Sequence, residues 1–159
     1  MIVLTSAEIE KCKQFAIEVT ATTLNVYQQR NSKLTETQAI ENAFRGKAGE
    51  LAVYKYLLEH DYYPSEIDFT VTDKKHHGAD IEIIGKGILL HIKTCKKSFL
   101  SWLFEKRAKY VSDPKANDFI CLVKQESFDC YEIISIRHSS GYDFLSPILP
   151  MRSKLAIYL

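Results

Sequence analysis

The sequence predicts an α+β fold, or α/β in the broader sense, in which helices flank a mixed central β-sheet. Two helical patterns, each opened by a capping box, fill the first 60 residues of the chain. Short segments rich in β-branched and aromatic residues follow them. Helices followed by a run of strands are typical of domains with this architecture.

Length and composition predict a single domain. A chain of 159 residues with 46% hydrophobic content can bury one core. We divide it into an N-terminal helix at 1–34, a core at 35–136 and a C-terminal extension at 137–159. A polar N-terminus and the lack of an apolar run of about 18 residues predict no signal peptide and no membrane partner. Four cysteines without a CxxC pair fit reduced thiols, so we expect a cytoplasmic protein.

The first two elements are helices. Thr5 and Glu8 form a capping box, and apolar residues follow at helical spacing as far as Val26. Thr35 and Gln38 form a second box, which opens a helical pattern that continues to residue 58. Gly46 and Gly49 lie inside this second pattern, where each glycine costs about 1 kcal/mol relative to alanine. They predict either a break near Gly46 or the close approach of another group.

The remaining elements are predicted as strands and turns. Strands are expected at 68–71, 80–84, 88–94, 118–123 and 130–136. The sequences GKG at 85–87 and KQESFD at 124–129 are typical of hairpin turns. WLF at 102–104 is a candidate strand, and the rest of 98–117 is expected to be a loop. The tail around Pro147 and Pro150 is expected to pack irregularly before SKLAIYL ends the chain.

Strand alternation gathers several polar residues on one face of the hairpin. Side chains two positions apart share a face, so Ile81, Ile83, Leu90 and Ile92 are predicted to face one core. The opposite face then carries two acids, an imidazole and an ammonium: Asp80, Glu82, His91 and Lys93. A solvated face of an ordinary antiparallel pair would look the same, so alternation alone does not decide between a site and a surface.

Glu50 is a further candidate on the second predicted helix. Gly46 and Gly49 precede it, and small residues there allow the helix to approach the sheet and direct the carboxylate toward it. The simpler alternative is a glutamate that faces solvent.

The order of these residues resembles the PD-(D/E)XK nuclease superfamily, which has the restriction-endonuclease-like fold. Glu50, in GKAGE, matches the helical glutamate in a context similar to that of archaeal Holliday-junction resolvases. Asp80, in HHGADIEI, matches the metal-binding aspartate, and Lys93, in LLHIKT, matches the lysine. The resemblance covers about residues 40 to 136, and the strands that follow are similar to those of small restriction-type nucleases. It implies hydrolysis of DNA with Mg²⁺ or Mn²⁺.

The chain departs from the family pattern at His91, where the superfamily usually has Glu or Asp. Three interpretations stay open. His91 itself binds the metal, Glu82 supplies the missing carboxylate from the paired strand, or the site is inactive. Imidazole is a softer ligand than carboxylate, so a metal site that contains His91 is expected to favour Mn²⁺ over Mg²⁺.

Basic residues cluster next to these candidates although the net charge of the chain is only +1. Residues 86–115 contain eight basic residues and two acids. Five of them are expected to hold the DNA backbone: Lys96, Lys97, Lys106, Arg107 and Lys109. The alternative is a solvated basic edge that prevents strands of different molecules from pairing. Trp102 and Phe104 are expected in the core rather than stacked on bases, and Tyr110 is expected to be structural.

These observations predict a divalent-metal-dependent DNA endonuclease that acts on double-stranded or branched DNA. The catalytic candidates are Glu50, Asp80, His91 and Lys93, and the candidate metal ligands are Asp80, Glu50, Glu82 and His91. The alternative functions are a catalytically inactive nucleic-acid-binding domain with the same fold and a purely structural protein. A homodimer is a further expectation, because cutting both strands of a duplex requires two active sites.

Overall fold

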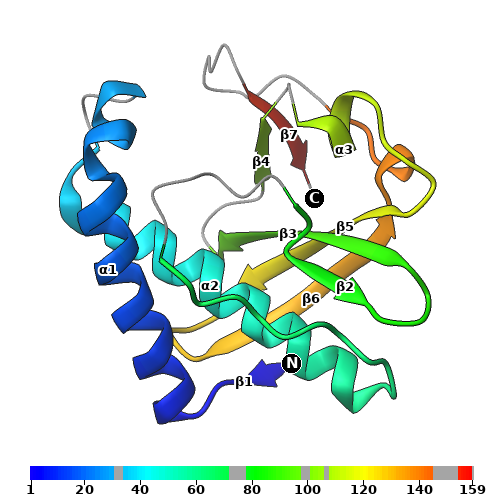
Figure 1. Ribbon diagram of the computed structural model, residues 1–159, viewed down its shortest axis with the longest axis horizontal. Coiled ribbons are helices and arrows are strands. Elements are labelled where there is room, and N and C mark those ends of the chain that lie inside the picture. The colour runs from blue at the N-terminus through cyan, green and yellow to red at the C-terminus, as the bar shows by residue number, and fades with distance from the viewer. Residues whose placement is uncertain (31–33, 72–77, 98–100, 106–107, 145–153, 159) are drawn as a thin grey trace.

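The computed structural model describes residues 1–30, 34–71, 78–97, 101–105, 108–144 and 154–158 (Figure 1). The helices are α1 (Ser6–Arg30), α2 (Glu36–Glu59) and α3 (Lys109–Ser112), with a 3-10 turn at Ser139–Gly141. The strands are β1 (Ile2–Val3), β2 (Ile81–Ile83), β3 (Ile88–Lys96), β4 (Ser101–Glu105), β5 (Asp118–Gln125), β6 (Cys130–His138) and β7 (Lys154–Tyr158). The predicted α+β class is therefore confirmed.

Five strands form the central sheet in the order β1-β6-β5-β3-β2, and β4 pairs with β7 in a separate two-stranded sheet. Strands β3 and β5 run parallel and the other neighbours are antiparallel, so the predicted mixed sheet is confirmed. Helix α2 crosses the central sheet and α1 lies against α2 (Figure 1). Neither these helices nor any other in the described ranges has the length and hydrophobicity to cross a membrane.

Both predicted capping boxes are present. The Thr5 backbone N–H donates to Glu8 Oε2 at 2.7 Å, and the Glu8 N–H donates to Thr5 Oγ1 at 3.3 Å. Thr35 and Gln38 make the same reciprocal pair at the start of α2. Each box satisfies two backbone donors that a helix start leaves without an intrahelical partner, which fixes where α1 and α2 begin.

Two predictions of secondary structure were wrong. Residues 68–71 form no strand, because Asp68 Oδ1 accepts the backbone N–H of Thr70 at 2.7 Å and so favours a local turn over extended pairing. The expected loop before β5 contains the short helix α3. The segment around Pro147 and Pro150, which is expected to pack irregularly, lies outside the described residues, and the C-terminal β7 that follows it pairs antiparallel with β4.

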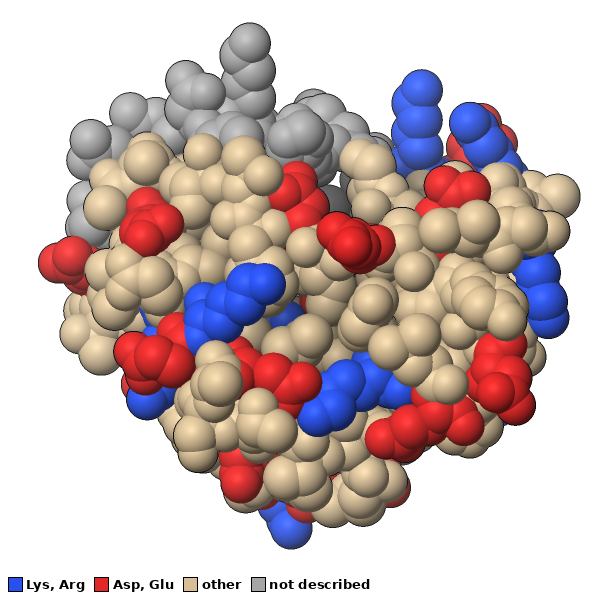
Figure 2. Space-filling view, turned by 60° about the horizontal axis from the view of Figure 1, so that its bottom comes forward, with Lys and Arg blue, Asp and Glu red and all other residues tan. Residues whose placement is uncertain are grey.

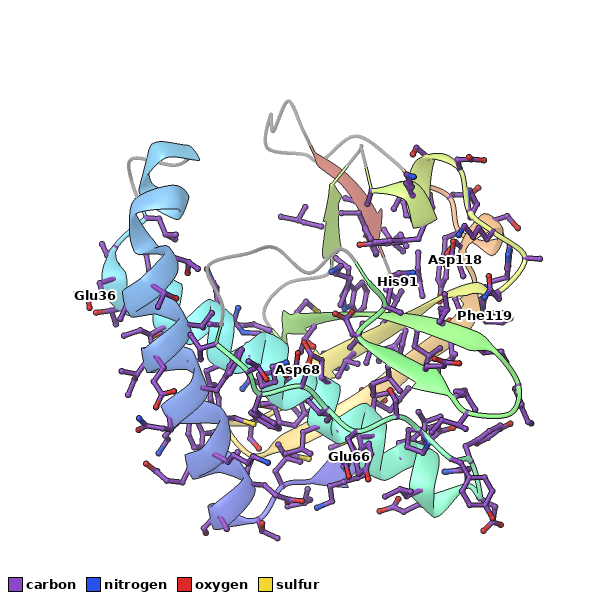
Figure 3. All side chains as sticks on the ribbon, viewed as in Figure 1. Glu36, Glu66, Asp68, His91, Asp118 and Phe119 are labelled. Atoms are coloured by element: carbon purple, nitrogen blue, oxygen red, sulfur yellow. The ribbon has the colours of Figure 1, made fainter. Side chains whose placement is uncertain are left out.

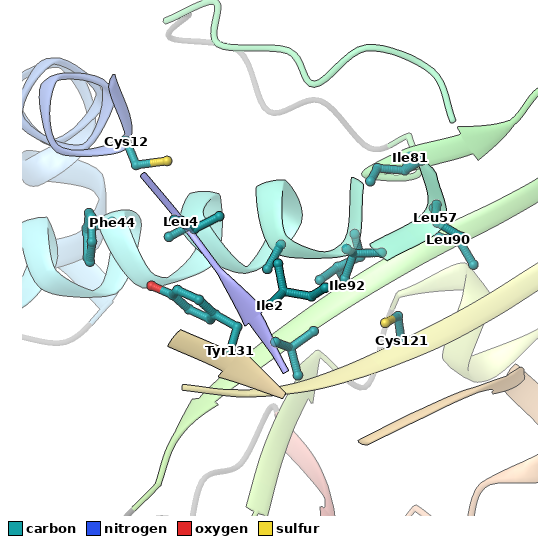
Figure 4. Close-up of a cluster of buried hydrophobic side chains, with 14 of the residues drawn as sticks. Ile2, Leu4, Cys12, Phe44, Leu57, Ile81, Leu90, Ile92, Cys121 and Tyr131 are labelled. Atoms are coloured by element: carbon teal, nitrogen blue, oxygen red, sulfur yellow. The ribbon is translucent and has the colours of Figure 1, made fainter. Parts of the chain in front are cut away.

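Two hydrophobic cores lie on opposite faces of the central sheet. The first, between the sheet and the helices, contains Ile81, Ile83, Leu90 and Ile92 as alternation predicts (Figure 4). The second contains six buried residues: Cys95, Trp102, Phe104, Ile120, Leu122 and Ile157. Strand β5 sends alternate residues into each core, which explains why its sequence is an almost continuous apolar run.

Trp102 and Phe104 belong to the second core, as expected. Their side chains are almost fully buried, and Trp102 Nε1 donates to the carbonyl oxygen of Val123 at 2.8 Å. The strand predicted at 102–104 is confirmed as part of β4. These aromatic rings therefore have no face available for stacking on nucleic-acid bases.

Helix α2 lies directly against β3 at Gly49. A Cβ atom at this position would lie 1.9 Å from Thr94 Oγ1 and 3.0 Å from Thr94 Cβ, whereas a Cβ at Gly46 would meet nothing within 4 Å. The helix continues through both glycines, so the close approach is confirmed at Gly49 and the break is not found. Thr94 Oγ1 is buried against this glycine, with no hydrogen-bond partner in the described ranges.

Gly49→Ala is expected to lower the free energy of unfolding by about 1–2 kcal/mol. Overpacking a core costs about 1–3 kcal/mol, and this cost exceeds the stability that alanine adds through its higher helix propensity. Gly46→Ala on the same helix is the matched control and should instead raise stability, by up to about 1 kcal/mol. Urea denaturation of both variants measures the difference. Thr94→Ala should remove the cost of Gly49→Ala. Equal stabilisation by alanine at both glycines would contradict the close approach.

Candidate functional site

Asp80 lies where β2 begins and is anchored to the edge of β3. Pairing of the two strands starts at Ile81 and Leu90, so β3 extends beyond its partner from this point. The Asp80 backbone N–H donates to Leu90 O at 2.9 Å, and the Ile92 N–H donates to Asp80 Oδ2 at 2.6 Å. The carboxylate of Asp80 thus takes the place of the missing strand partner of Ile92.

Glu50 reaches this region from α2 and does not face solvent. Its side chain is only 17% exposed, and its Oε2 forms an ion pair with Lys47 Nζ at 2.5 Å. Lys47 also donates to the carbonyl oxygen of Asp68 at 2.9 Å, which ties α2 to the segment that passes over it. Burial, followed by the negative charge of Asp80, raises the pKa of Glu50 to about 7.

Lys93 is the cation of the cluster. Burial would lower the pKa of Lys93, but Tyr110 and the carboxylates of Asp80 and Glu50 outweigh it and raise the pKa above its usual value. The ammonium is therefore protonated at neutral pH. Three elements, α2, the start of β2 and β3, thus supply Glu50, Asp80 and Lys93, which interact electrostatically with one another.

His91 lies on the same face of β3 as Lys93 but is held by other residues. It is 6% exposed, so this part of the face is not a solvated surface. Its Nε2 lies 3.3 Å from Asp118 Oδ1, at the start of the parallel neighbour β5. Its ring stacks on that of Tyr110, with centroids 3.8 Å apart and an interplanar angle of 11°. Figure 3 shows His91 close to Asp118 and apart from Asp68 beside α2.

Burial of His91 and the hydrogen bonds to Asp118 favour a neutral imidazole beside an ionised carboxylate. Burial lowers the pKa of His91 despite the nearby acids. Burial would raise the pKa of Asp118, but hydrogen bonds from the Lys115 backbone N–H, at 2.8 Å, and from His91 bring it below its usual value. At neutral pH His91 therefore serves as a hydrogen-bonded flat ring rather than as a cation.

Glu82 is exposed, two residues beyond Asp80 in the direction of the hairpin turn. Its backbone N–H donates to Ser65 Oγ at 3.0 Å. Its carboxylate has neither an ion pair nor a hydrogen bond to any residue that the structure describes. Glu82 does not influence Glu50 or Lys93 as Asp80 does, so it lies outside the electrostatic cluster.

Two acidic residues of the site could hold a divalent cation. Across the described ranges, no three His, Cys, Asp or Glu side chains come together in a metal-binding arrangement. The site offers the two carboxylates of Glu50 and Asp80, and Mg²⁺ is commonly held by one or two carboxylates while it keeps several waters. The two carboxylates repel each other, and this repulsion helps to raise the pKa of Glu50. A bound divalent cation would relieve the repulsion.

The predicted DNA-binding residues do not form one basic patch. Lys96 pairs with Glu41 at 3.2 Å, and Lys97 pairs with Glu126 at 2.7 Å. Lys109 is exposed on α3, and the two remaining candidates, 106 and 107, lie outside the described residues. Figure 2 shows Lys and Arg interspersed with Asp and Glu on the face that it presents.

Sequence reasoning missed three residues next to the predicted ones. Lys47 is three positions before Glu50 on a helix, a spacing that does predict contact. Asp118 contacts His91 across 27 positions of sequence, and Tyr110 comes from a segment expected to be a loop. No local signal in the sequence predicts either of these two contacts.

Comparisons of the chain with protein-family models, with curated proteins and with solved structures found no match. The chemistry of this site is therefore argued from its own residues.

Proposed function

We propose that this protein is a divalent-metal-dependent endonuclease that hydrolyses phosphodiester bonds in DNA. The observation that carries the proposal is that two carboxylates, Glu50 and Asp80, and the ammonium of Lys93 are close enough to influence one another electrostatically. Each comes from a different element, and Glu50 is buried beside a like charge, an arrangement typical of functional sites.

In this proposal Glu50 and Asp80 hold Mg²⁺ or Mn²⁺. A divalent cation held there would supply a water molecule of lowered pKa and would neutralise charge on the phosphate. Lys93 is protonated and stabilises the negative charge that develops on the phosphate oxygens, rather than removing a proton. Lys47 keeps the Glu50 carboxylate in place through their ion pair.

Nucleic acid as the substrate is supported by an exposed cation close to the site. Lys109 is exposed next to Tyr110, which contacts Lys93, so α3 presents a positive charge close to the cluster. For Lys96 and Lys97 to bind phosphate, their ion pairs with Glu41 and Glu126 would have to break. We therefore expect binding that weakens with salt and carries little sequence information.

The test is incubation of the purified protein with supercoiled plasmid, four-way-branched DNA and RNA in Mg²⁺ or Mn²⁺. We expect cleavage of DNA that EDTA abolishes and that Lys93→Ala slows by about 10²-fold, because a charge that stabilises the transition state is lost. Lys86→Ala, at a lysine over the ring of Tyr62, is the control and should cut normally. A DNA gel shift without cleavage in either metal would instead support the non-catalytic nucleic-acid-binding domain.

A further inference from the structure

We propose that His91 and Tyr110 are positioning residues for Lys93, with Asp118 fixing the imidazole. This inference rests on the proposed nuclease function, because it assigns a role to residues around the same site. It also gives a reason for histidine where the resembling family has an acid. A flat, neutral ring supports a tyrosine ring, which a carboxylate does not do.

His91 has a fixed orientation. Its ring is buried and Nε2 is 3.3 Å from Asp118 Oδ1. Asp118 is itself held, since its Oδ2 accepts the Lys115 N–H at 2.8 Å and its backbone carbonyl accepts Ser139 Oγ at 3.0 Å. The position of Nε2 and the plane of the imidazole ring are therefore fixed by contacts with β5 and with the turns on either side of it.

The His91 ring determines where Tyr110 lies. Helix α3 has only four residues and its N-cap makes no side-chain hydrogen bond, so the helix alone places Tyr110 weakly. The near-parallel stack on His91, at 3.8 Å, and packing against the second core hold the tyrosine on the sheet.

Tyr110 in turn lies close to Lys93. Lys93 Nζ lies 6.0 Å from the centroid of the tyrosine ring, and the Tyr110 side chain acts electrostatically on the ammonium. A lysine side chain has four flexible bonds and loses considerable entropy when it is held in one geometry. Tyr110 restricts that freedom, so the ammonium stays where it can act on a phosphate instead of moving between the carboxylates.

The experiment compares Tyr110→Phe, which keeps the stack and removes the hydroxyl, with Tyr142→Phe. Tyr142 packs against the same core and its hydroxyl donates to Ile120 O at 3.1 Å, so it is the matched control. Tyr110→Phe should lower the single-turnover cleavage rate about 10- to 100-fold, with the melting temperature and the Kd for DNA unchanged. In a Lys93→Ala background it should have no further effect. An unchanged rate, or a loss additive with that of Lys93→Ala, would overturn the inference.

A second readout does not depend on cleavage. In protein labelled with ¹⁵N-lysine, the Lys93 ammonium signal, assigned by its loss in Lys93→Arg, should shift in Tyr110→Phe and not in Tyr142→Phe. A shift in a protein that cuts nothing would support the contact while rejecting the nuclease function. A signal that does not move would reject the positioning role in either case.

Discussion

Asp80→Asn is expected to lower the rate of metal-dependent DNA cleavage by about 10³-fold, the upper range for removing one group that stabilises developing charge. Asparagine has the same shape and its carbonyl oxygen still accepts the Ile92 N–H, which in the native protein is 2.6 Å from Asp80 Oδ2. The strand edge therefore keeps its geometry and only the negative charge is lost. Single-turnover cleavage in Mg²⁺ and in Mn²⁺ measures the effect.

Glu82→Gln is the matched control for this variant. The two acids are two residues apart in the sequence, but Glu82 is exposed and Asp80 is bound to β3. We expect Glu82→Gln to cut at the native rate and to need no more metal than the native protein. Loss of activity in Glu82→Gln with activity retained in Asp80→Asn would show that Glu82 is the strand carboxylate of the site.

Glu50→Gln is expected to make the protein more stable at alkaline pH, by about 3 kcal/mol at pH 8. The pKa of Glu50 is raised from 4.5 to about 7, so the folded chain holds this proton more tightly than the unfolded chain does. Stability from this group is complete below the unfolded pKa and is lost as the pH rises from there to about 7. Glutamine cannot ionise and avoids the loss.

Urea denaturation at several pH values tests this dependence. The stability gain of Glu50→Gln should be below about 1 kcal/mol at pH 5 and should grow to its full size by pH 8. Glu66→Gln, at an exposed acid beside α2, should show no such growth (Figure 3). A variant less stable than the native protein at pH 8 would mean that the ion pair between Glu50 and Lys47 outweighs burial and repulsion.

Local patterns in the sequence predicted the elements that position the site. Two capping boxes identified where α1 and α2 begin, because their hydrogen bonds join residues only three apart. Alternation identified which residues of β2 and β3 face the first core, because a hairpin turn fixes their register. The small residue at Gly49 predicted that α2 approaches the sheet, and this approach brings Glu50 to β3.

Contacts between distant segments were not predictable in the same way. The partner of His91 comes from β5, and the parallel pairing of β3 with β5 has no local signature in either strand. Tyr110 reaches the sheet through a four-residue helix whose sequence carries no strong helical pattern. The role of His91 therefore became apparent only when Asp118 and Tyr110 were seen around it.

The parallel pairing of β3 with β5 also affects how quickly the site can form during folding. The hairpin of β2 and β3 closes over a short turn, whereas β5 reaches β3 only after the chain has crossed back from Lys96 to Asp118. Ordering such a crossover costs loop entropy before its contacts form. We expect the hydrogen bonds between Asp80 and β3 to form early in folding. His91, Tyr110 and Lys93 should reach their final positions late in folding. A partly folded chain would then carry its carboxylates without a fixed ammonium and be unable to cut DNA before folding is complete.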